Sequence, residues 1–155
     1  IQVVYEKELL WTAGTLLNNI SFFDHQDGIF IHADNYTLDD LKNFIKFHTK
    51  RPKSSLVSMM TFETNNPSSC GIIKKNKENI VTNFFEKKNG NFGNEANGAV
   101  YILSKEFQKL LVEKFPNTYD FSTEILGSLK NQIAAYKTEK FFLDIGTIDN
   151  YSLVK

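Results

Sequence analysis

The sequence predicts a mixed α/β fold, in which helices flank one sheet. Short apolar runs typical of strands alternate along the chain with stretches whose apolar residues recur at helical spacing. Two of the strand-like runs follow each other closely enough to form a hairpin. With 155 residues, 41% of them hydrophobic, the chain can form one domain with a sizeable core.

The first elements are a strand and a helix. Ile1–Tyr5 is predicted to be a strand, and because it opens the chain without a methionine or a turn, we expect upstream sequence to be missing. The next apolar residues, from Leu16 to Phe23, have helical spacing, and Thr12 can cap this helix.

A second strand is predicted over Ile29–Ile31, short and apolar enough to be a buried parallel strand. It ends at Asp34 and Asn35. Ligands bind at the carboxyl ends of strands in open α/β sheets, so this carboxylate and amide could hold a cation or a sugar hydroxyl. The alternative is a turn, because Asp-Asn is ordinary turn chemistry.

A helix capped within Thr37–Asp40 follows, and its inner or half-inner face is predicted to carry Leu41, Phe44, Ile45 and His48. His48 near its end is predicted to be a surface histidine paired with the helix dipole. The remaining predicted elements are a strand over 55–64, a hairpin of 70–74 and 80–87, a flexible loop over 89–97, a strand over 99–103, a helix over 105–115, a helix opening at 120–124 and a polar-alternating edge strand over 134–140.

Near the other end, the run F-F-L-D-I-G-T over Phe141–Thr147 again delivers one acid after an apolar stretch. Asp144 and Asp34 could therefore converge on one divalent metal. Mg²⁺ suits such a pair because it takes one or two protein carboxylates and completes its octahedron with water and phosphates. The alternative is that Asp144 caps a helix over Thr147–Val154.

Composition excludes several classes of function. Eighteen basic residues balance eighteen acidic ones, which leaves no electrostatic footprint for nucleic acid or an anionic membrane. No apolar run is long enough to span a membrane, and no signal peptide is recognised. The one cysteine, Cys70, suits a reducing cytoplasm. P-loop, dinucleotide-binding, zincin and serine-hydrolase motifs are absent, and His32 is interpreted as a satisfied histidine rather than a base.

Six short stretches, in order, carry a resemblance to a known family: Y-E-K-E-L-L-W-T-A-G-T-L, I-H-A-D-N, C-G-I-I, F-E-K, A-N-G-A-V-Y and F-L-D-I-G-T. With them the chain resembles the sugar-1-phosphate nucleotidyltransferases, above all the mannose and heptose guanylyltransferases. The resemblance implies a mixed, mainly parallel, Rossmann-like nucleotidyltransferase sheet flanked by helices. Residues 1–155 would be the C-terminal portion of a single nucleotidyltransferase domain, incomplete at its N-terminus.

The resemblance also implies roles for individual residues. Asp34 and Asp144 would hold the Mg²⁺ cofactor, and Lys87 would join them as a catalytic residue. The residues that would bind the nucleotide are Thr12, Ala13 and Gly14. Sugar-phosphate binding falls to Asn35, Gly71, Glu86, Lys87 and Asn97. The implied partners are a nucleoside triphosphate and a sugar 1-phosphate, and neither nucleic acid nor a membrane is expected as a partner. Whether the protein forms a homo-oligomer is left open.

Two departures from the family pattern bear on activity. Trp11 stands where the family usually has glycine, and the family's glycine-rich loop with its Arg, and the Lys that follows it, are not in these 155 residues. We therefore expect the fragment alone to be inactive and the full-length protein to transfer a nucleotidyl group, with guanylyl favoured over thymidylyl or uridylyl. The competing hypothesis is a catalytically silent nucleotide-sugar-binding or regulatory module of the same fold.

Overall fold

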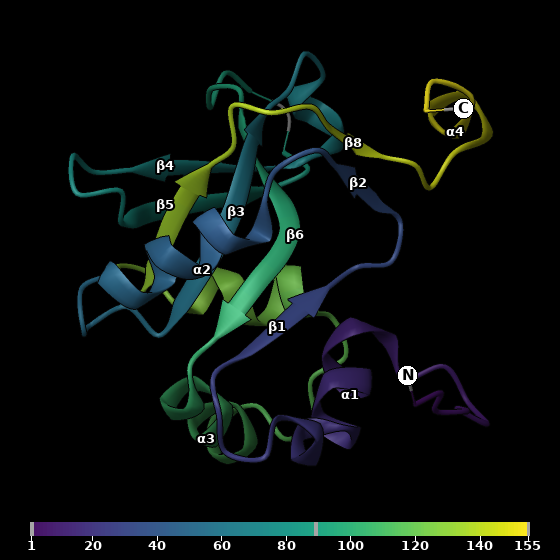
Figure 1. Cartoon of the computed structure of the whole chain (residues 1–155), viewed down its shortest axis with the longest axis vertical. Coiled ribbons are helices and arrows are strands. Elements are labelled where there is room, and N and C mark those ends of the chain that lie inside the picture. The colour runs from purple at the N-terminus through teal and green to yellow at the C-terminus, as the bar shows by residue number, and fades with distance from the viewer. Residues whose placement is uncertain (1, 89, 155) are drawn as a thin grey trace.

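The computed structural model describes residues 2–88 and 90–154 (Figure 1). Its strands are β1 Gly28–Ile31, β2 Asn35–Thr37, β3 Val57–Glu63, β4 Gly71–Lys75, β5 Val81–Glu86, β6 Glu95–Leu103, β7 Ile133–Lys137 and β8 Phe142–Asp144. Its α-helices are α1 Trp11–Asn18, α2 Leu41–Lys50, α3 Lys105–Lys114 and α4 Ile148–Ser152. A π-helical turn, Phe121–Ile125, and short 3₁₀ turns complete the described elements.

The main sheet has six strands. Five follow the order β5-β4-β6-β3-β7, and β1 pairs with β6 on the side opposite to β3. The remaining strands, β2 and β8, form a separate antiparallel ribbon. The predicted mixed α/β sheet is confirmed. Its parallel component is the β3–β7 pair, whereas the other pairings among the described strands are antiparallel, which corrects the expectation of a mainly parallel sheet.

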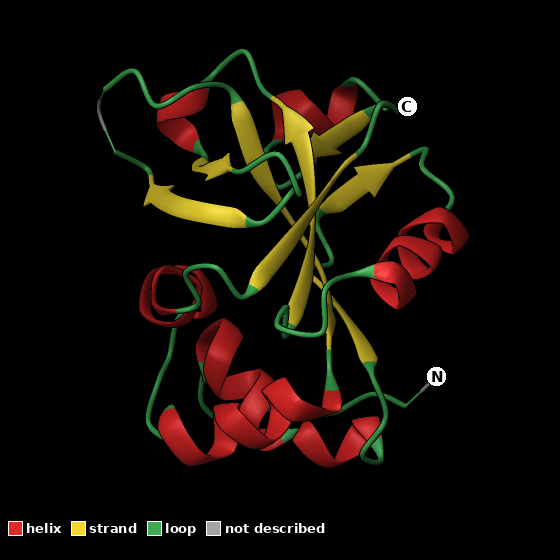
Figure 2. Ribbon diagram, turned by 90° about the vertical axis from the view of Figure 1, so that its left-hand side faces the viewer, coloured by secondary structure: helices red, strands yellow, loops and turns green. Residues whose placement is uncertain are grey.

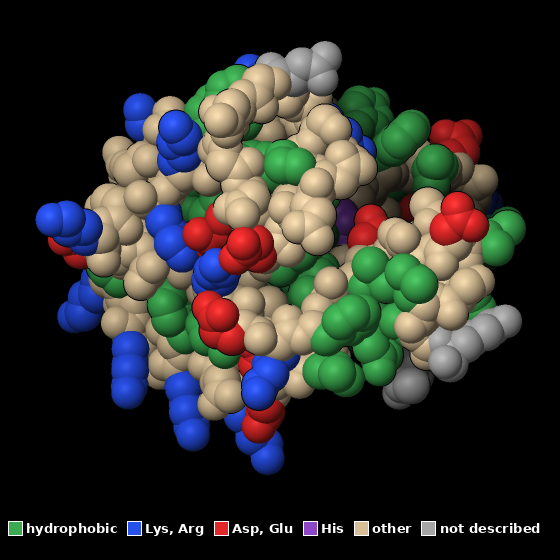
Figure 3. All heavy atoms as spheres, turned by 90° about the horizontal axis from the view of Figure 1, so that it is seen from above, with side chains coloured by type: hydrophobic (Ala, Val, Ile, Leu, Met, Phe, Trp, Pro, Cys, Tyr) green, Lys and Arg blue, Asp and Glu red, His purple; other side chains and the backbone are tan. Residues whose placement is uncertain are grey.

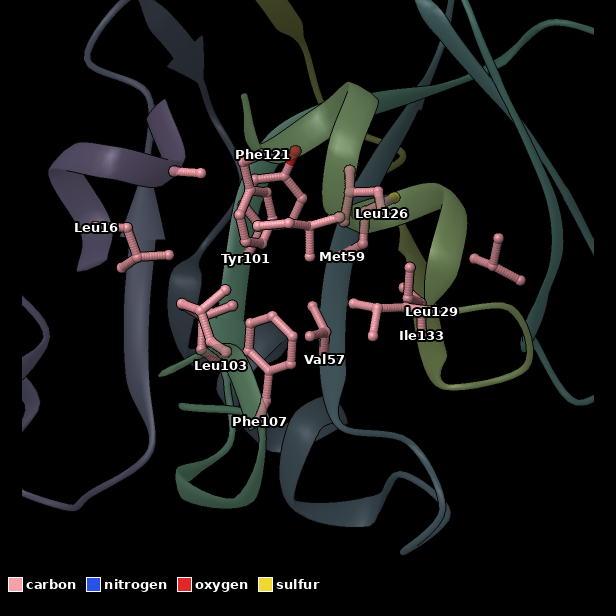
Figure 4. Packing of buried hydrophobic residues seen from close by; sticks show 14 of the residues in the cluster. Leu16, Val57, Met59, Tyr101, Leu103, Phe107, Phe121, Leu126, Leu129 and Ile133 are labelled. Atoms are coloured by element: carbon pink, nitrogen blue, oxygen red, sulfur yellow. The ribbon is translucent and has the colours of Figure 1, made fainter. Parts of the chain in front are cut away.

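Side chains alternate between the two faces of β3, and each face has its own core. Val57 and Met59 enter the larger core, where α1, α3 and the segment from Phe121 to Leu129 cover the sheet (Figure 4). Met60 faces the other way and packs against α2. Figure 2 shows that most of the helices gather at one end of the sheet. The opposite end holds the β2–β8 ribbon, loops and the short helix α4.

Three N-terminal predictions are wrong. Residues 2–5 form no strand, and Ile1 lies outside the described residues. Helix α1 begins at Trp11, and Thr12 does not cap it; its hydroxyl instead accepts a hydrogen bond from the Phe121 N–H at 2.8 Å. Strand β1 exists but is antiparallel and half-exposed, because only β6 lies beside it among the described strands.

The predictions for several later elements also differ from the structure, because these elements depend on tertiary contacts. β6 begins at Glu95, so the predicted loop ends at Asn94, and its first residue, Asn89, is outside the described residues. β7 lies at the sheet edge as predicted, but its first three residues are buried and the polar alternation fails. Thr147, and not Asp144, caps α4 by accepting the Asn150 N–H at 3.2 Å. Of the helices that the structure describes, none combines the length and apolarity needed to cross a membrane.

Candidate active site

The β2–β8 ribbon brings the two predicted metal ligands together. Its register pairs Asn35 with Asp144, and the Ile145 N–H donates to the Asp34 carbonyl at 2.7 Å. The ribbon is attached to the main sheet through Phe142, which stacks on Phe62 with ring centroids 4.5 Å apart. Two segments far apart in sequence, β2 and β8, therefore lie side by side, at the upper right of Figure 1.

Gly146 shows how closely the two carboxylates approach. A Cβ added to it would lie 2.9 Å from Asp144 Oδ1 and 3.1 Å from Asp34 Oδ2, so the two oxygens flank the same small space. No group of three or more His, Cys, Asp or Glu side chains among the described residues could hold a metal. A site with two carboxylates fits Mg²⁺, which takes its other ligands from water and phosphates.

A cleft of about 510 Å³ opens beside these carboxylates. Figure 3 looks onto this side of the molecule and shows acidic side chains and a histidine at a hollow in the surface. All predicted sugar-phosphate residues line the cleft together with the metal pair: Asp34, Asn35, Gly71, Glu86, Lys87, Asn97 and Asp144. The structure thus assembles in one cavity the groups for which the resemblance implied metal and sugar-phosphate binding.

Glycine at position 71 makes room for the Glu86 carboxyl. The β4–β5 register sets the two residues opposite each other, and a Cβ on Gly71 would lie 2.6 Å from Glu86 Oε2 and 2.8 Å from Phe84 Cζ. Burial raises the pKa of Glu86, the positive charge of Lys87 lowers it, and the carboxylate of Asp120 raises it. Glu86 is therefore a half-buried carboxyl suited to hydrogen bonding with hydroxyl groups.

Lys87 directly follows β5, where the chain turns away from the sheet. Its φ of +44° lies in the left-handed region, and its N–H donates to the Cys70 carbonyl at 3.3 Å. Its side chain forms no ion pair with the described residues. An exposed, unpaired ammonium at the cleft is available to bind a phosphate.

Asn97 is held by hydrogen bonds inside the protein. Its Nδ2 donates to the Tyr101 hydroxyl at 2.7 Å, and its Oδ1 accepts the Ala99 N–H at 2.9 Å. Tyr101 is fully buried, and burial raises the pKa of its hydroxyl. These bonds fix the orientation of the Asn97 amide at the cleft wall, which reduces the entropy lost on ligand binding.

The residues predicted to bind the nucleotide lie elsewhere. Thr12, Ala13 and Gly14 belong to the first turn of α1 and do not line the cleft. Ala13 is buried, and Gly14 borders a different hollow of about 480 Å³ between α1 and Pro116–Tyr119. The structure therefore brings together the metal and sugar-phosphate residues but leaves 12–14 outside this cavity.

Sequence reasoning missed other cleft residues. Asp120, Ser122 and Thr123 enter from the turn that opens the π-helical segment, where the stretch D-F-S-T-E has more polar residues than a cap requires. These additional polar residues were the feature of the sequence that could have identified this turn as part of the site. His32 also lines the cleft, and contrary to the prediction its buried Nε2 has no hydrogen-bond partner among the described residues.

His48 lies on the inner face of α2 as predicted, but its predicted role as a surface histidine is wrong, because the side chain is buried. Its Nδ1 lies 2.8 Å from the Ser58 hydroxyl and its Nε2 3.1 Å from Asp27 Oδ2. Burial lowers the pKa of His48, Arg51 lowers it further, and Asp27 raises it. A neutral ring that donates from Nε2 and accepts at Nδ1 satisfies both partners. Ser58 is fully buried, so no substrate reaches this Asp-His-Ser group and its role is structural.

Comparisons with known proteins show the family to which the chain belongs. A family model described as "Nucleotidyl transferase" matches residues 1–155. Glucose-1-phosphate adenylyltransferase of Mycoplasma mobile is 27% identical over 96% of this chain and 42% of its own length. The enzyme of the same name from Bacillus subtilis is 23% identical over 92% of this chain and 41% of its own. The chain thus spans about two fifths of the length of these relatives.

Solved structures show the same fold. HddC from Yersinia pseudotuberculosis complexed with GMP-PN superimposes with a TM-score of 0.74 at 24% identity, covering 97% of this chain and 63% of that one. A putative glucose-1-phosphate thymidylyltransferase from Bacillus anthracis in complex with a sucrose gives 0.80 at 15% identity, covering 97% and 61%. The predicted resemblance to sugar-1-phosphate nucleotidyltransferases is confirmed. Because the family model matches the whole sequence, the chain belongs to the nucleotidyl transferase family.

Proposed function

We propose that this chain supplies the metal-binding and sugar-phosphate-binding part of an enzyme that transfers a nucleotidyl group to a sugar 1-phosphate. The donor is a nucleoside triphosphate, and the products are a nucleotide sugar and pyrophosphate. One observation carries the proposal: Asp34 and Asp144 flank the same space at the edge of a cleft that also contains Glu86 and Lys87.

Each side chain has a chemical task in this reaction. An oxygen of the sugar phosphate attacks the α-phosphorus, a new P–O bond forms, and the bond to the leaving pyrophosphate breaks. Asp34 and Asp144 would hold Mg²⁺, which when bound neutralises negative charge on the reacting phosphates. Lys87 binds the sugar phosphate, while Glu86, Asn97 and Asn35 orient the sugar. Positioning and electrostatic stabilisation thus supply most of the rate.

The nucleotide and the sugar are finer parts of the proposal. We favour GTP, supported by the resemblance to sugar-phosphate guanylyltransferases and by the fold shared with HddC, solved with GMP-PN. The adenylyltransferase names of the relatives make ATP the first alternative. We place the enzyme in the cytoplasm, in the synthesis of nucleotide sugars for polysaccharides, acting on small molecules rather than nucleic acid, with a homo-oligomer open to test.

The test uses the full-length protein that contains this chain, with Mg²⁺, each common nucleoside triphosphate and a panel of sugar 1-phosphates. Pyrophosphate release and nucleotide-sugar formation should both appear and should both be lost in Asp34→Asn and Asp144→Asn. Asp24→Asn, an exposed carboxylate outside the cleft, is the matched control. If nucleotide and sugar 1-phosphate bind but no pyrophosphate forms, the protein is a silent binding module and the proposal fails.

A further inference from the structure

Trp11 has features that its role in the fold does not explain. It is the single tryptophan of the sequence, and it is 58% exposed. Its indole makes no ring contact with the described residues, and it belongs to neither core cluster. Its φ of +61° lies in the left-handed region, which is costly for a large side chain. Packing of this side chain therefore contributes little stability, while its backbone conformation lowers it.

The direction of α1 brings Trp11 to the carboxyl end of β1. The ring of Phe23, after α1, lies against Gly28 at the start of β1, where an added Cβ would overlap it. Leu16, earlier in the chain, lines one hollow with Phe30, which is later in β1. The two elements therefore run in opposite directions side by side (Figure 1). Eight helical residues and four strand residues each span about 12 Å, so the start of α1 lies level with the end of β1.

Hydrogen bonds place Trp11 beside the cleft as well. The Ala13 N–H donates to the Tyr119 carbonyl at 2.8 Å, and the Thr12 hydroxyl accepts the Phe121 N–H at 2.8 Å. These two segments also run in opposite directions. The step from Thr12 back to Trp11 thus leads toward the residues after Phe121, which line the cleft. Trp11 is not one of the lining residues itself, and so it stands at the rim of the cavity.

The position of the metal pair indicates which part of a ligand reaches this rim. In the proposed reaction the α-phosphate binds at the metal held by Asp34 and Asp144. Asp34 follows β1, and the base is joined to the α-phosphate through one ribose only. The base must therefore lie within the length of one nucleoside from the end of β1. Trp11 offers an exposed aromatic face in this region, and every base has a π face that can stack on it.

We propose that Trp11 stacks on the base of the nucleoside triphosphate. The inference rests on the proposed function, because it takes the metal pair to hold the α-phosphate. Glycine, which the family usually has at this position, offers no side chain for such a contact, so the stack is an addition made by this chain. Stacking depends on ring area and not on the hydrogen-bonding edge of the base. Purine triphosphates should therefore bind more tightly than pyrimidine triphosphates, and the stack by itself does not distinguish GTP from ATP.

The first measurement follows tryptophan emission of the full-length protein during titration with GTP, ATP, CTP and UTP in the presence of Mg²⁺. Subtracting the same titration of Trp11→Phe isolates the signal of Trp11 from that of any other tryptophan. This signal should fall with the triphosphates, and more with the purines. It should not change with tripolyphosphate or glucose 1-phosphate, which have no base.

The second measurement is the Kd for GTP by calorimetry. Trp11→Gly removes the ring and suits the left-handed backbone, so Kd should rise about tenfold while the melting temperature does not fall. Trp11→Phe keeps an aromatic face and should stay within about threefold of the wild type. Phe22→Ala is the matched control, because Phe22 is 59% exposed and does not line the cleft. Its Kd should equal that of the wild type.

Three results would overturn the inference: unchanged emission of Trp11, unchanged Kd in Trp11→Gly, or an equal rise of Kd in Phe22→Ala. Tighter binding by Trp11→Gly would also overturn it and would mean that the ring obstructs the base. If the emission falls and Trp11→Gly binds more weakly but no nucleotide sugar forms, the inference stands and the proposed function fails. If nucleotide sugar forms and the triphosphate KM is the same in Trp11→Gly, the proposed function stands and the inference fails. A wild-type protein that binds no nucleotide would refute both.

Discussion

Strand β1 has an aspartate on each side of it, Asp27 before Gly28 and Asp34 after Ile31, and the two carboxylates have opposite surroundings. Asp27 accepts the Lys105 N–H at 2.9 Å, lies 3.1 Å from His48 Nε2 and approaches the Arg51 guanidinium at 4.0 Å. The Asp34 carboxylate accepts no hydrogen bond from the described residues and instead faces Asp144 across a small space.

The difference shows how one residue type performs two tasks. Asp27 joins the chain before β1 to α2 and α3, so its hydrogen bonds stabilise the fold. Asp34 stands beside another carboxylate and forms no ion pair with the described residues, which costs stability unless a ligand supplies the positive charge. The Asp34 carboxylate, without a hydrogen-bond partner among the described residues, is therefore a better candidate for ligand binding than Asp27, and four experiments test this distinction.

The largest effect is expected on catalysis. Asp34→Asn should lower nucleotidyl transfer by the full-length protein about 100-fold or more, because it removes one of two charged metal ligands. Asp27→Asn should stay within about threefold of the wild-type rate, since its carboxylate lies outside the cleft. Both rates are measured as pyrophosphate release at saturating substrates and Mg²⁺. Equal losses in the two variants would contradict the division between the two aspartates.

The second expected effect is on stability. Here the order of the two sites is the reverse of that for catalysis, because the Asp27 variant should lose more stability than the Asp34 variant. Asp27→Ala should lower the free energy of unfolding by about 2 kcal/mol, because it leaves the Lys105 N–H and buried His48 without their acceptor. Asp34→Ala should change it by less than about 0.5 kcal/mol. Urea denaturation followed by circular dichroism in the absence of Mg²⁺ measures both. A larger loss in Asp34→Ala would show that the open carboxylate stabilises the fold.

The two regions should also respond differently to pH. Burial lowers the pKa of His48, so the unfolded chain takes up this proton first, and stability should fall as pH drops below about 6.5. Burial raises the pKa of Glu86, so its contribution to stability increases as pH falls. Urea midpoints at pH 7.5 and 5.5 measure the balance. His48→Gln should flatten the decline and Glu86→Gln should steepen it; the opposite pattern would reject these assignments.

The smallest effect concerns the space between the metal ligands. Gly146→Ala should weaken Mg²⁺ binding several-fold, because the added methyl group would lie about as close to both carboxylates as a hydrogen-bond partner does. Gly127→Ala is the control, since a Cβ there meets nothing within 4 Å. Binding can be followed by the electron paramagnetic resonance of Mn²⁺. Equal affinity in the two variants would mean that the metal does not occupy this space.

Local pattern was sufficient for part of the fold and the site. Apolar runs that end at an acid indicated Asp34 and Asp144 as candidate site residues. The charged end of another apolar strand indicated Glu86 and Lys87. These predictions needed no knowledge of the tertiary structure, because side chains at the end of a strand are exposed wherever the strand lies in the sheet. The hairpin of β4 and β5 and the helix α3 were also found, because their signals lie within a few neighbouring residues.

Other features depend on contacts that local pattern does not encode. His48 is buried because Asp27 and Ser58, distant in sequence, provide partners for both ring nitrogens. Asp120 is a capping residue by local pattern, and it lines the cleft because the turn that holds it, next to the contact between Phe121 and Tyr101, borders the cavity. The nucleotide-binding role of Thr12, Ala13 and Gly14 stays a prediction.

The β2–β8 ribbon gives the metal site a consequence for the unfolded chain. Each of its strands has three residues, too few for a stable hairpin alone, and the acids it aligns are separated by about a hundred residues. A cation bound by both carboxylates would close this long loop as a cross-link does. By tying distant segments together, it would reduce the conformational entropy of states in which the rest of the chain has opened. Asp34 and Asp144 would then form a reversible cross-link that exists only while the metal is bound.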